Sequence, residues 1–120
     1  MFNSVTLVGR LTRDAVTTEI NNEHKTPVTR FTLAVDRDYK DKDGKTPTDF
    51  WPVKVFGEYG VKLAAHLTKG RVALVDGAAQ LDSRKDDAVE YHTYAYIAAR
   101  QIRFMDRPKQ AEREPGQDEQ

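Results

Sequence analysis

Apolar and polar side chains alternate in five stretches of the chain, and this period-two pattern is typical of half-buried β-strands. The stretches cover residues 5–11, 28–38, 49–56, 71–82 and 90–104. Polar residues, glycine and proline, which favour turns, separate them. The pattern therefore predicts five strands of one largely antiparallel sheet.

The apolar spacing becomes helical between residues 58 and 69. Tyr59, Leu63 and Leu67 are four positions apart, and Lys69-Gly70 is a typical helix end. Three strands, a helix and two more strands is the element order of the OB-fold, a five-stranded Greek-key barrel with a helix between strands three and four. We therefore expect an all-β protein, a β-barrel with one short helix.

Polar segments connect these elements. We predict a long exposed loop over residues 39–48 and a charged hairpin over residues 83–89. Residues 107–120 contain two prolines and a single apolar residue, which is too little to join a core. The expected organisation is one OB-fold domain over residues 1–106, followed by a disordered polar tail over residues 107–120.

The composition narrows the class of protein. The chain has 120 residues and a mass of 13.7 kDa, the size of one compact domain. It has no cysteine, which excludes disulfides, thiolate zinc sites and cysteine nucleophiles. No apolar run approaches the ~20 residues that span a bilayer, and the first residues do not resemble a secretion signal. We expect a soluble, cytoplasmic protein with no membrane partner.

The charges are balanced overall but not along the chain. The chain has nineteen basic and nineteen acidic residues, yet residues 1–71 carry 12 basic and 9 acidic side chains. A site for a polyanion should therefore use mainly this first part. Nine basic residues are candidates for phosphate contacts, although any one of them alone is more often a solvated surface charge. The nine candidates are Arg10, Arg13, Arg30, Lys54, Lys62, Lys69, Arg71, Arg84 and Lys85.

Period two divides the strand predicted at residues 49–56 into two faces. Trp51, Val53 and Val55 share the expected core face, and Phe50, Pro52, Lys54 and Phe56 share the solvent face. Exposed phenyl rings need a partner, and unpaired bases stack on them at ~1–3 kcal/mol per base while a lysine neutralises a phosphate. Tyr39, in the preceding loop, is a candidate for a third ring. Alternatively, Phe50 and Phe56 close a mouth of the barrel or are buried in a subunit contact.

Residue groups that carry catalysis are missing from the sequence. His24, His66 and His92 are far apart, and none has a second ligand at a spacing that places both on one face. The chain contains neither a phosphate-cradling glycine-rich loop nor a nucleophile elbow. We therefore predict a binding protein and not an enzyme, with no metal site and no cofactor.

Several runs of residues resemble the bacterial-type single-stranded DNA-binding proteins. They are NxVxLVGRLTxD, FTLAV, DFxPVxV, HLxKG and VDG, which begin at residues 3, 31, 49, 66 and 75. Each run is weak evidence alone, but their order and spacing match the family over about residues 3–105.

The resemblance implies an OB-fold that assembles as a homotetramer and holds single-stranded DNA by stacking and phosphate contacts, without a base code. By position, Tyr39, Phe50 and Phe56 match the family's stacking aromatics, and Lys69 matches a basic residue. Arg84 matches only if two residues are inserted earlier in its strand, which a β-bulge would accommodate.

The sequence also departs from the family pattern. Asp14 is followed by Ala15, where the family often has proline. Members commonly end in an acidic tip closed by Pro-Phe, which docks replication and repair proteins, whereas this chain ends in GQDEQ. Recruitment of such partners through a C-terminal tip is therefore unsupported by the sequence.

Residues and resemblance together predict non-enzymatic, largely sequence-independent binding and protection of single-stranded DNA. The expected setting is replication, recombination and repair at the nucleoid. Two alternatives stay open: an OB-fold protein-interaction module and an RNA-binding module.

Overall fold

The computed structural model describes residues 1–20, 23–85 and 91–106, of which residues 84, 85 and 91 are described by their backbone only. Residues 86–89 of the predicted hairpin and the predicted tail over residues 107–120 lie outside the described residues, whereas residues 83–85 continue the preceding strand instead of forming the hairpin turn. The elements are β1 (Val5–Leu11), β2 (Val16–Glu19), β3 (Pro27–Asp36), β4 (Thr48–Phe56), α1 (Glu58–Leu63), a 3₁₀-helix (Ala64–His66), β5 (Val72–Lys85) and β6 (Tyr91–Phe104).

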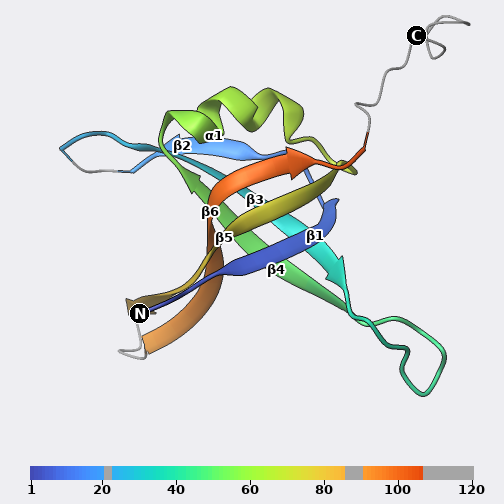
Figure 1. Ribbon diagram of the computed structural model, residues 1–120. Helices are drawn as coiled ribbons and strands as arrows, with labels where there is room; N and C mark the ends of the chain where they lie inside the picture. The colour runs from blue at the N-terminus through green and yellow to red at the C-terminus, as the bar shows by residue number, and fades with distance from the viewer. Residues whose placement is uncertain (21–22, 86–90, 107–120) are drawn as a thin grey trace, which may run out of the picture.

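The strands form a closed barrel, which Figure 1 shows with α1 across one end. Their order in the sheet is β1-β5-β6-β4-β3-β2, and a further pairing of β1 with β3 closes the ring. The paired strands are antiparallel except β4 and β6, which pair in parallel at Val53 and Lys54. The predicted all-β barrel with one short helix between strands is confirmed.

The core is built from the inward-facing residues of the long strands. Leu33, Val53, Val75 and Ile97, from β3, β4, β5 and β6, are each at most 1% exposed. Helix α1 lies close against this barrel, since a Cβ atom at Gly60 would lie 2.8 Å from the side-chain oxygen of a threonine on β3. Only glycine therefore allows the helix to close the end of the barrel at this distance.

The helix is shorter than the spacing predicted. Helix α1 and the 3₁₀-helix together end at His66 rather than at Lys69. Leu67 leaves the helical backbone, with φ −87° and ψ 74°, and its side chain is fully buried. Burial of this leucine in the core overrides the continuing helical period.

Strand β2 is missing from the sequence prediction, so the sheet has six strands rather than five. All four of its residues are exposed, and it pairs with β3 from Val16 opposite Arg30 to Glu19 opposite Pro27. Because all four side chains of this edge strand are exposed, it shows no alternation of buried apolar and exposed polar residues, which is the pattern that predicts a strand.

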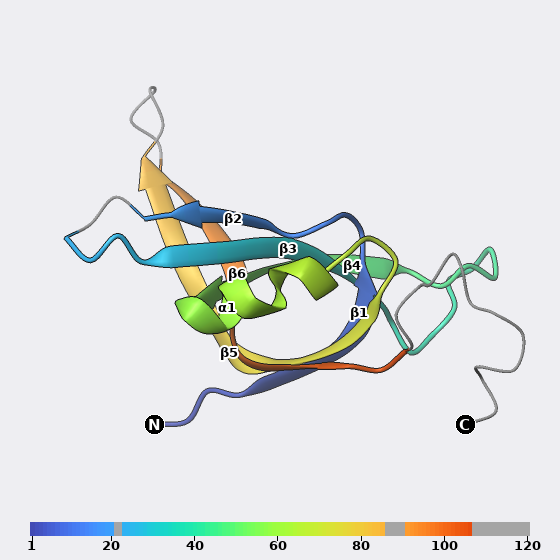
Figure 2. The same cartoon turned by 90° about the horizontal axis from the view of Figure 1, so that it is seen from above.

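The loop between β3 and β4 and the far ends of β5 and β6 extend beyond the barrel, and Figures 1 and 2 show them pointing in different directions. One is the predicted polar loop, which joins β3 to β4 and is exposed from Arg37 to Thr46. The other is formed by the last residues of β5 paired with the first residues of β6, and each of these strands is 14 residues long. We call this segment, residues 80–85 and 91–96, the arm. Within the described ranges, no helix is long and apolar enough to cross a membrane.

The pairing of β5 with β6 contains an irregularity, but not the insertion in β5 that the match of Arg84 to the family pattern would need. The register shifts between Asp76, opposite Gln101, and Gly77, opposite Ala99. The extra residue is thus Arg100 on β6, and its side chain donates a hydrogen bond of 2.8 Å to the carbonyl oxygen of Gly77. The bulge therefore lies on the partner strand and not on β5.

Candidate nucleic-acid interface

The outward face of β4 carries two exposed phenylalanines. Phe50 is 64% exposed and Phe56 is 43% exposed, whereas Val53 and Val55 are each 1% exposed. The side chains of β4 thus alternate between solvent and core along the strand. The predicted division of this strand into a core face and a solvent face is confirmed.

A groove crosses the same face of the sheet. It consists of two hollows of about 360 and 290 Å³ that share Arg30, Pro52 and Lys54 in their walls. We call this continuous depression the groove. Its lining includes Arg13, Asp14, Val16, Arg30, Pro52, Lys54, Asp82, Tyr94 and Tyr96. The groove therefore reaches from β2 to the arm and passes between the two exposed phenylalanines of β4.

Two cations face each other across the centre of the groove. Arg30 on β3 pairs directly with Lys54 on β4, an arrangement of like charges that costs stability in a sheet. Arg30 donates a hydrogen bond to the Thr18 hydroxyl on β2. The Lys54 ammonium lies 4.2 Å from the centre of the Tyr96 ring and 3.8 Å from the Asp82 carboxylate. The groove thus holds two cations whose mutual repulsion a bound anion would relieve.

Two further predicted cations lie at the β2 end of the groove. Arg13 lines the larger hollow together with Asp14. The Asp14 carboxylate accepts a hydrogen bond of 2.8 Å from the backbone N–H of Lys69, which brings exposed Lys69 beside this end. The structure therefore groups Arg13, Arg30 and Lys54 along the groove and brings the backbone of Lys69 beside its β2 end.

The other predicted cations lie elsewhere. Arg10 lines a separate hollow at β1 and donates a hydrogen bond of 2.8 Å to the Gly70 carbonyl oxygen, and Lys62 is exposed on α1. Arg84 and Lys85 belong to β5, but their side chains are outside the described part of the structure.

Arg71 is turned inward and is only 6% exposed. Its guanidinium lies 4.1 Å from the centre of the Phe104 ring and 3.0 Å from the Asp106 carboxylate. Partial burial raises the pKa of Asp106, but hydrogen bonds from Arg71 and from the backbone N–H of Val72 outweigh it and hold the pKa below its ordinary value. Because Arg71 anchors the end of β6, we remove it from the candidate interface.

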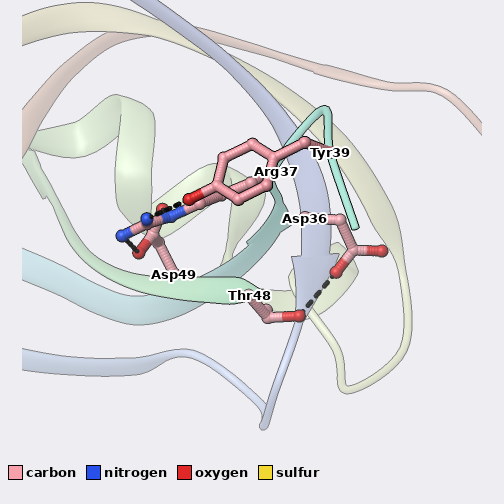
Figure 3. A network of polar contacts seen from close by, with 5 residues as sticks. All are labelled: Asp36, Arg37, Tyr39, Thr48 and Asp49. Carbon is pink, nitrogen blue, oxygen red and sulfur yellow. Dashed lines mark hydrogen bonds and ion pairs between the residues drawn. The ribbon is translucent and has the colours of Figure 1, made fainter. Parts of the chain in front are cut away.

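The predicted third ring, Tyr39, is held by an ion pair at the base of the loop between β3 and β4, which Figure 3 shows. Arg37 donates two hydrogen bonds of 2.9 and 3.0 Å to the Asp49 carboxylate and one of 2.7 Å to the Tyr39 hydroxyl. These contacts raise the pKa of Arg37, and the hydrogen bond from Arg37 lowers the pKa of Asp49. The ion pair therefore fixes Tyr39 beside the residue that precedes Phe50.

Tyr39 nevertheless does not line the groove. It lines a different hollow together with Trp51 and Leu7, at the rim of the barrel. Trp51 packs against the core, as its parity predicted, but it is half-buried rather than fully buried because it lies at this open rim. Phe50 and Phe56 thus lie on the outward face of β4 on either side of the groove without lining it, and Tyr39 lies at the rim of the barrel.

Sequence reasoning missed the aromatic residues of the arm. Tyr94 and Tyr96 were not among the candidates drawn from the sequence, but both line the groove. Tyr94 is 53% exposed and Tyr96 is half-buried. The sequence could have indicated this, because Tyr94 and Tyr96 are two residues apart and Tyr96 directly precedes the core residue Ile97. In a strand, this spacing places both tyrosines on the face opposite the core.

An OB-fold barrel whose groove combines exposed rings with cations is typical of proteins that bind single-stranded nucleic acid. Across the described ranges, no group of three or more histidine, aspartate or glutamate side chains is placed to hold a metal ion. The site therefore offers stacking surfaces and positive charge as its chemistry.

Comparison with known proteins identifies the family. The profile of the single-strand binding protein family matches residues 2–105. The single-stranded DNA-binding protein of Caldanaerobacter subterraneus is 37% identical over 106 residues, which is 88% of this chain and 69% of that protein. That of Aquifex aeolicus is 33% identical over 122 residues, which is 100% of this chain and 81% of that protein. The chain belongs to the single-strand binding protein family.

A solved structure has the same fold. It is a complex of Plasmodium falciparum SSB with ssDNA, with a TM-score of 0.75 and 22% sequence identity, and the match covers 88% of this chain and 97% of that one. The predicted OB-fold and the predicted family are therefore confirmed, and with them the class of protein, a binding protein rather than an enzyme.

Proposed function

We propose that this protein binds single-stranded DNA by stacking bases on the exposed rings of β4 and by neutralising phosphates in the groove. The observation that carries the proposal is the exposure of Phe50 and Phe56 on either side of Lys54. Solvent-facing phenyl rings contribute little to folding, whereas every base has a flat face that stacks on such a ring. Membership of the single-strand binding protein family supports the same ligand.

The geometry supports a path along β4. Phe50 and Phe56 are six residues apart, or about 20 Å along an extended strand, so bases stacked on the two rings belong to nucleotides that are not neighbours. Arg30 and Lys54 lie between the rings and face each other. Phosphates of the intervening nucleotides would separate these like charges and release bound counterions. Neither ring stacking nor phosphate contact depends on base identity.

Arg13 and Lys69 would extend the cationic path at the β2 end, where both lie beside Asp14. Tyr39 would add a third stacking surface only if the DNA passes round the rim of the barrel. Stacking and phosphate contact both keep a single strand extended and covered, which protects it during replication, recombination and repair. This role places the protein with cellular DNA in the cytoplasm.

We infer that the protein assembles as a homotetramer. Exposed apolar side chains outside the groove support assembly, among them Val8 on β1 and Leu81 on β5, which is 73% exposed. A barrel this small gains stability when such surface is buried between copies. Light scattering should give the mass of four chains, and a monomer mass at micromolar concentration would contradict the inference.

The experiment that tests the function is a competition between oligo(dT) and oligo(U) of equal length at low and high salt. We expect tight binding of oligo(dT) that weakens as salt is added, because cations compete with lysine and arginine for the phosphates. Preference for oligo(U) would favour the RNA-binding alternative. Failure to bind either oligonucleotide would favour the protein-interaction module and would overturn the proposal.

A further inference from the structure

The hollow at the arm end of the groove differs from the rest of the groove in its polar groups. It has a volume of about 290 Å³ and is lined by Arg30, Pro52, Lys54, Asp82, Tyr94 and Tyr96, among others. It therefore combines two cations, two aromatic rings and one carboxylate around a space open to solvent.

The two tyrosines of this hollow are not equivalent. The Tyr96 hydroxyl donates a hydrogen bond of 2.7 Å to Gln80, and the Lys54 ammonium lies 4.2 Å from the centre of its ring. One face of Tyr96 is thus occupied by a cation. Tyr94 is 53% exposed, and its ring meets that of His92 at 6.5 Å between centres with a tilt of 36°. Tyr94 is the ring that presents surface to a ligand.

The carboxylate stands beside that ring. Asp82 on β5 pairs directly with Tyr94 on β6, and directly opposed residues have Cβ atoms about 4.5–5.5 Å apart. The Asp82 side chain is 41% exposed, and its carboxylate is 3.8 Å from the Lys54 ammonium. A flat ligand on Tyr94 would therefore meet a hydrogen-bond acceptor at its edge and cations close by.

We propose that this hollow binds one unpaired nucleobase on Tyr94, and that the Asp82 carboxylate favours a base with an exocyclic amino group over thymine. Cytosine carries an N4 amino donor and adenine an N6 amino donor, whereas thymine carries the O4 acceptor at the corresponding position. An ionised carboxylate only accepts hydrogen bonds, so it stabilises the first two bases and repels the carbonyl oxygen of the third. Arg30 and Lys54 supply positive charge for the flanking phosphates.

This inference rests on the proposed function and adds a base preference to a path that otherwise has none. The test measures the dissociation constants of oligo(dC) and oligo(dT) of one length, at neutral pH, for the full chain and its variants. The informative quantity is the ratio of the two constants. Removal of the negative charge in Asp82→Ala strengthens phosphate binding to both oligonucleotides, and this general effect cancels in the ratio.

We expect Asp82→Ala to shift the ratio about five-fold toward oligo(dT). Tyr94→Ala should weaken both oligonucleotides about five-fold or more, whereas Tyr94→Phe keeps the stacking surface and should bind normally. In the Tyr94→Ala background, Asp82→Ala should no longer change the ratio. Asp43→Ala is the matched control, because it also removes an exposed carboxylate but lies in the loop between β3 and β4, outside the groove, and it should leave the ratio unchanged.

An Asp82→Ala variant with an unchanged ratio would overturn the base preference, and a Tyr94→Ala variant with unchanged affinity would overturn the site. Thermal melting of each variant separates loss of binding from loss of folding. If the unmodified protein binds neither oligonucleotide, the proposed function fails. If it binds and Phe50→Ala weakens it while Tyr94→Ala does not, this inference alone fails.

Discussion

Replacement of Phe50 by alanine separates DNA binding from folding most cleanly. The side chain is 64% exposed and lies opposite Ala34 on β3, so its removal uncovers little apolar surface. Stacking of one base on a ring is worth ~1–3 kcal/mol, which corresponds to a rise in the dissociation constant of about 5- to 140-fold. We therefore expect weaker binding of oligo(dT) and an unchanged melting temperature.

Phe56 is a less clean probe because it also covers part of the sheet. It is 43% exposed and lies opposite Val28, which is fully buried although it is on the same face. Phe56→Ala should therefore weaken binding by a similar factor and also expose Val28, at a cost of about 1 kcal/mol of folding stability. The comparison of the two variants shows how much of each effect comes from stacking.

Fluorescence anisotropy of labelled oligo(dT) measures the affinity, and circular dichroism measures the stability. Val55→Ala is the matched interior variant, since Val55 is 1% exposed and lines neither hollow of the groove. It should cost about 2 kcal/mol of stability and leave the affinity of the folded protein unchanged. Met105→Ala, at an exposed position after the end of β6, should change neither quantity. Normal affinity of both phenylalanine variants would refute the assignment of stacking to this face.

Three further results are expected. Lys54→Gln should lower the affinity for oligo(dT). It should also reduce the slope of log affinity against log salt concentration by about 0.7, which is the value of one phosphate contact to a single strand. An unchanged slope would exclude Lys54 from the phosphate path. Arg71→Ala should leave the affinity of the folded protein unaltered but lower stability by about 1–3 kcal/mol, because the Asp106 carboxylate and the Phe104 ring lose their partner. The pKa of Asp106 is lowered in the folded protein. Its contribution to stability is therefore present above its unfolded pKa of about 3.9 and is lost as the pH falls through the lower folded value. Asp106→Asn should flatten this part of the acid-unfolding curve, and an identical curve would show that the carboxylate is not linked to folding.

The sequence by itself determined the main strands and the two faces of β4. The bounds of β1 were predicted correctly, and Phe50 and Phe56 were placed on the solvent face. Both results are local, because a strand with one buried face must alternate its side chains with a period of two, whatever its neighbours are. Exposed aromatic residues on the solvent face then pointed to a ligand without knowledge of the barrel.

Contacts between distant segments were decided only by the tertiary structure. Gly9 interrupts the alternation of Val5, Leu7 and Leu11 in β1, and the structure explains it, since a Cβ atom there would overlap the carbonyl oxygen of Ala34 on β3. Trp51 proved half-buried because it lies at the rim of the barrel, and Arg71 proved buried because Phe104 and Asp106 enclose it. None of these neighbours is near in sequence.

The interface itself shows the same division. The alternation of side chains along β4 predicted which of its rings face solvent. It did not predict that Arg30 lies opposite Lys54 or that Tyr94 lies opposite Asp82. Those pairs depend on strand register, which backbone hydrogen bonding and burial of the whole sheet set together. The groove exists only once β2, β3, β4 and the arm lie side by side, because each strand alone contributes a single row of its side chains.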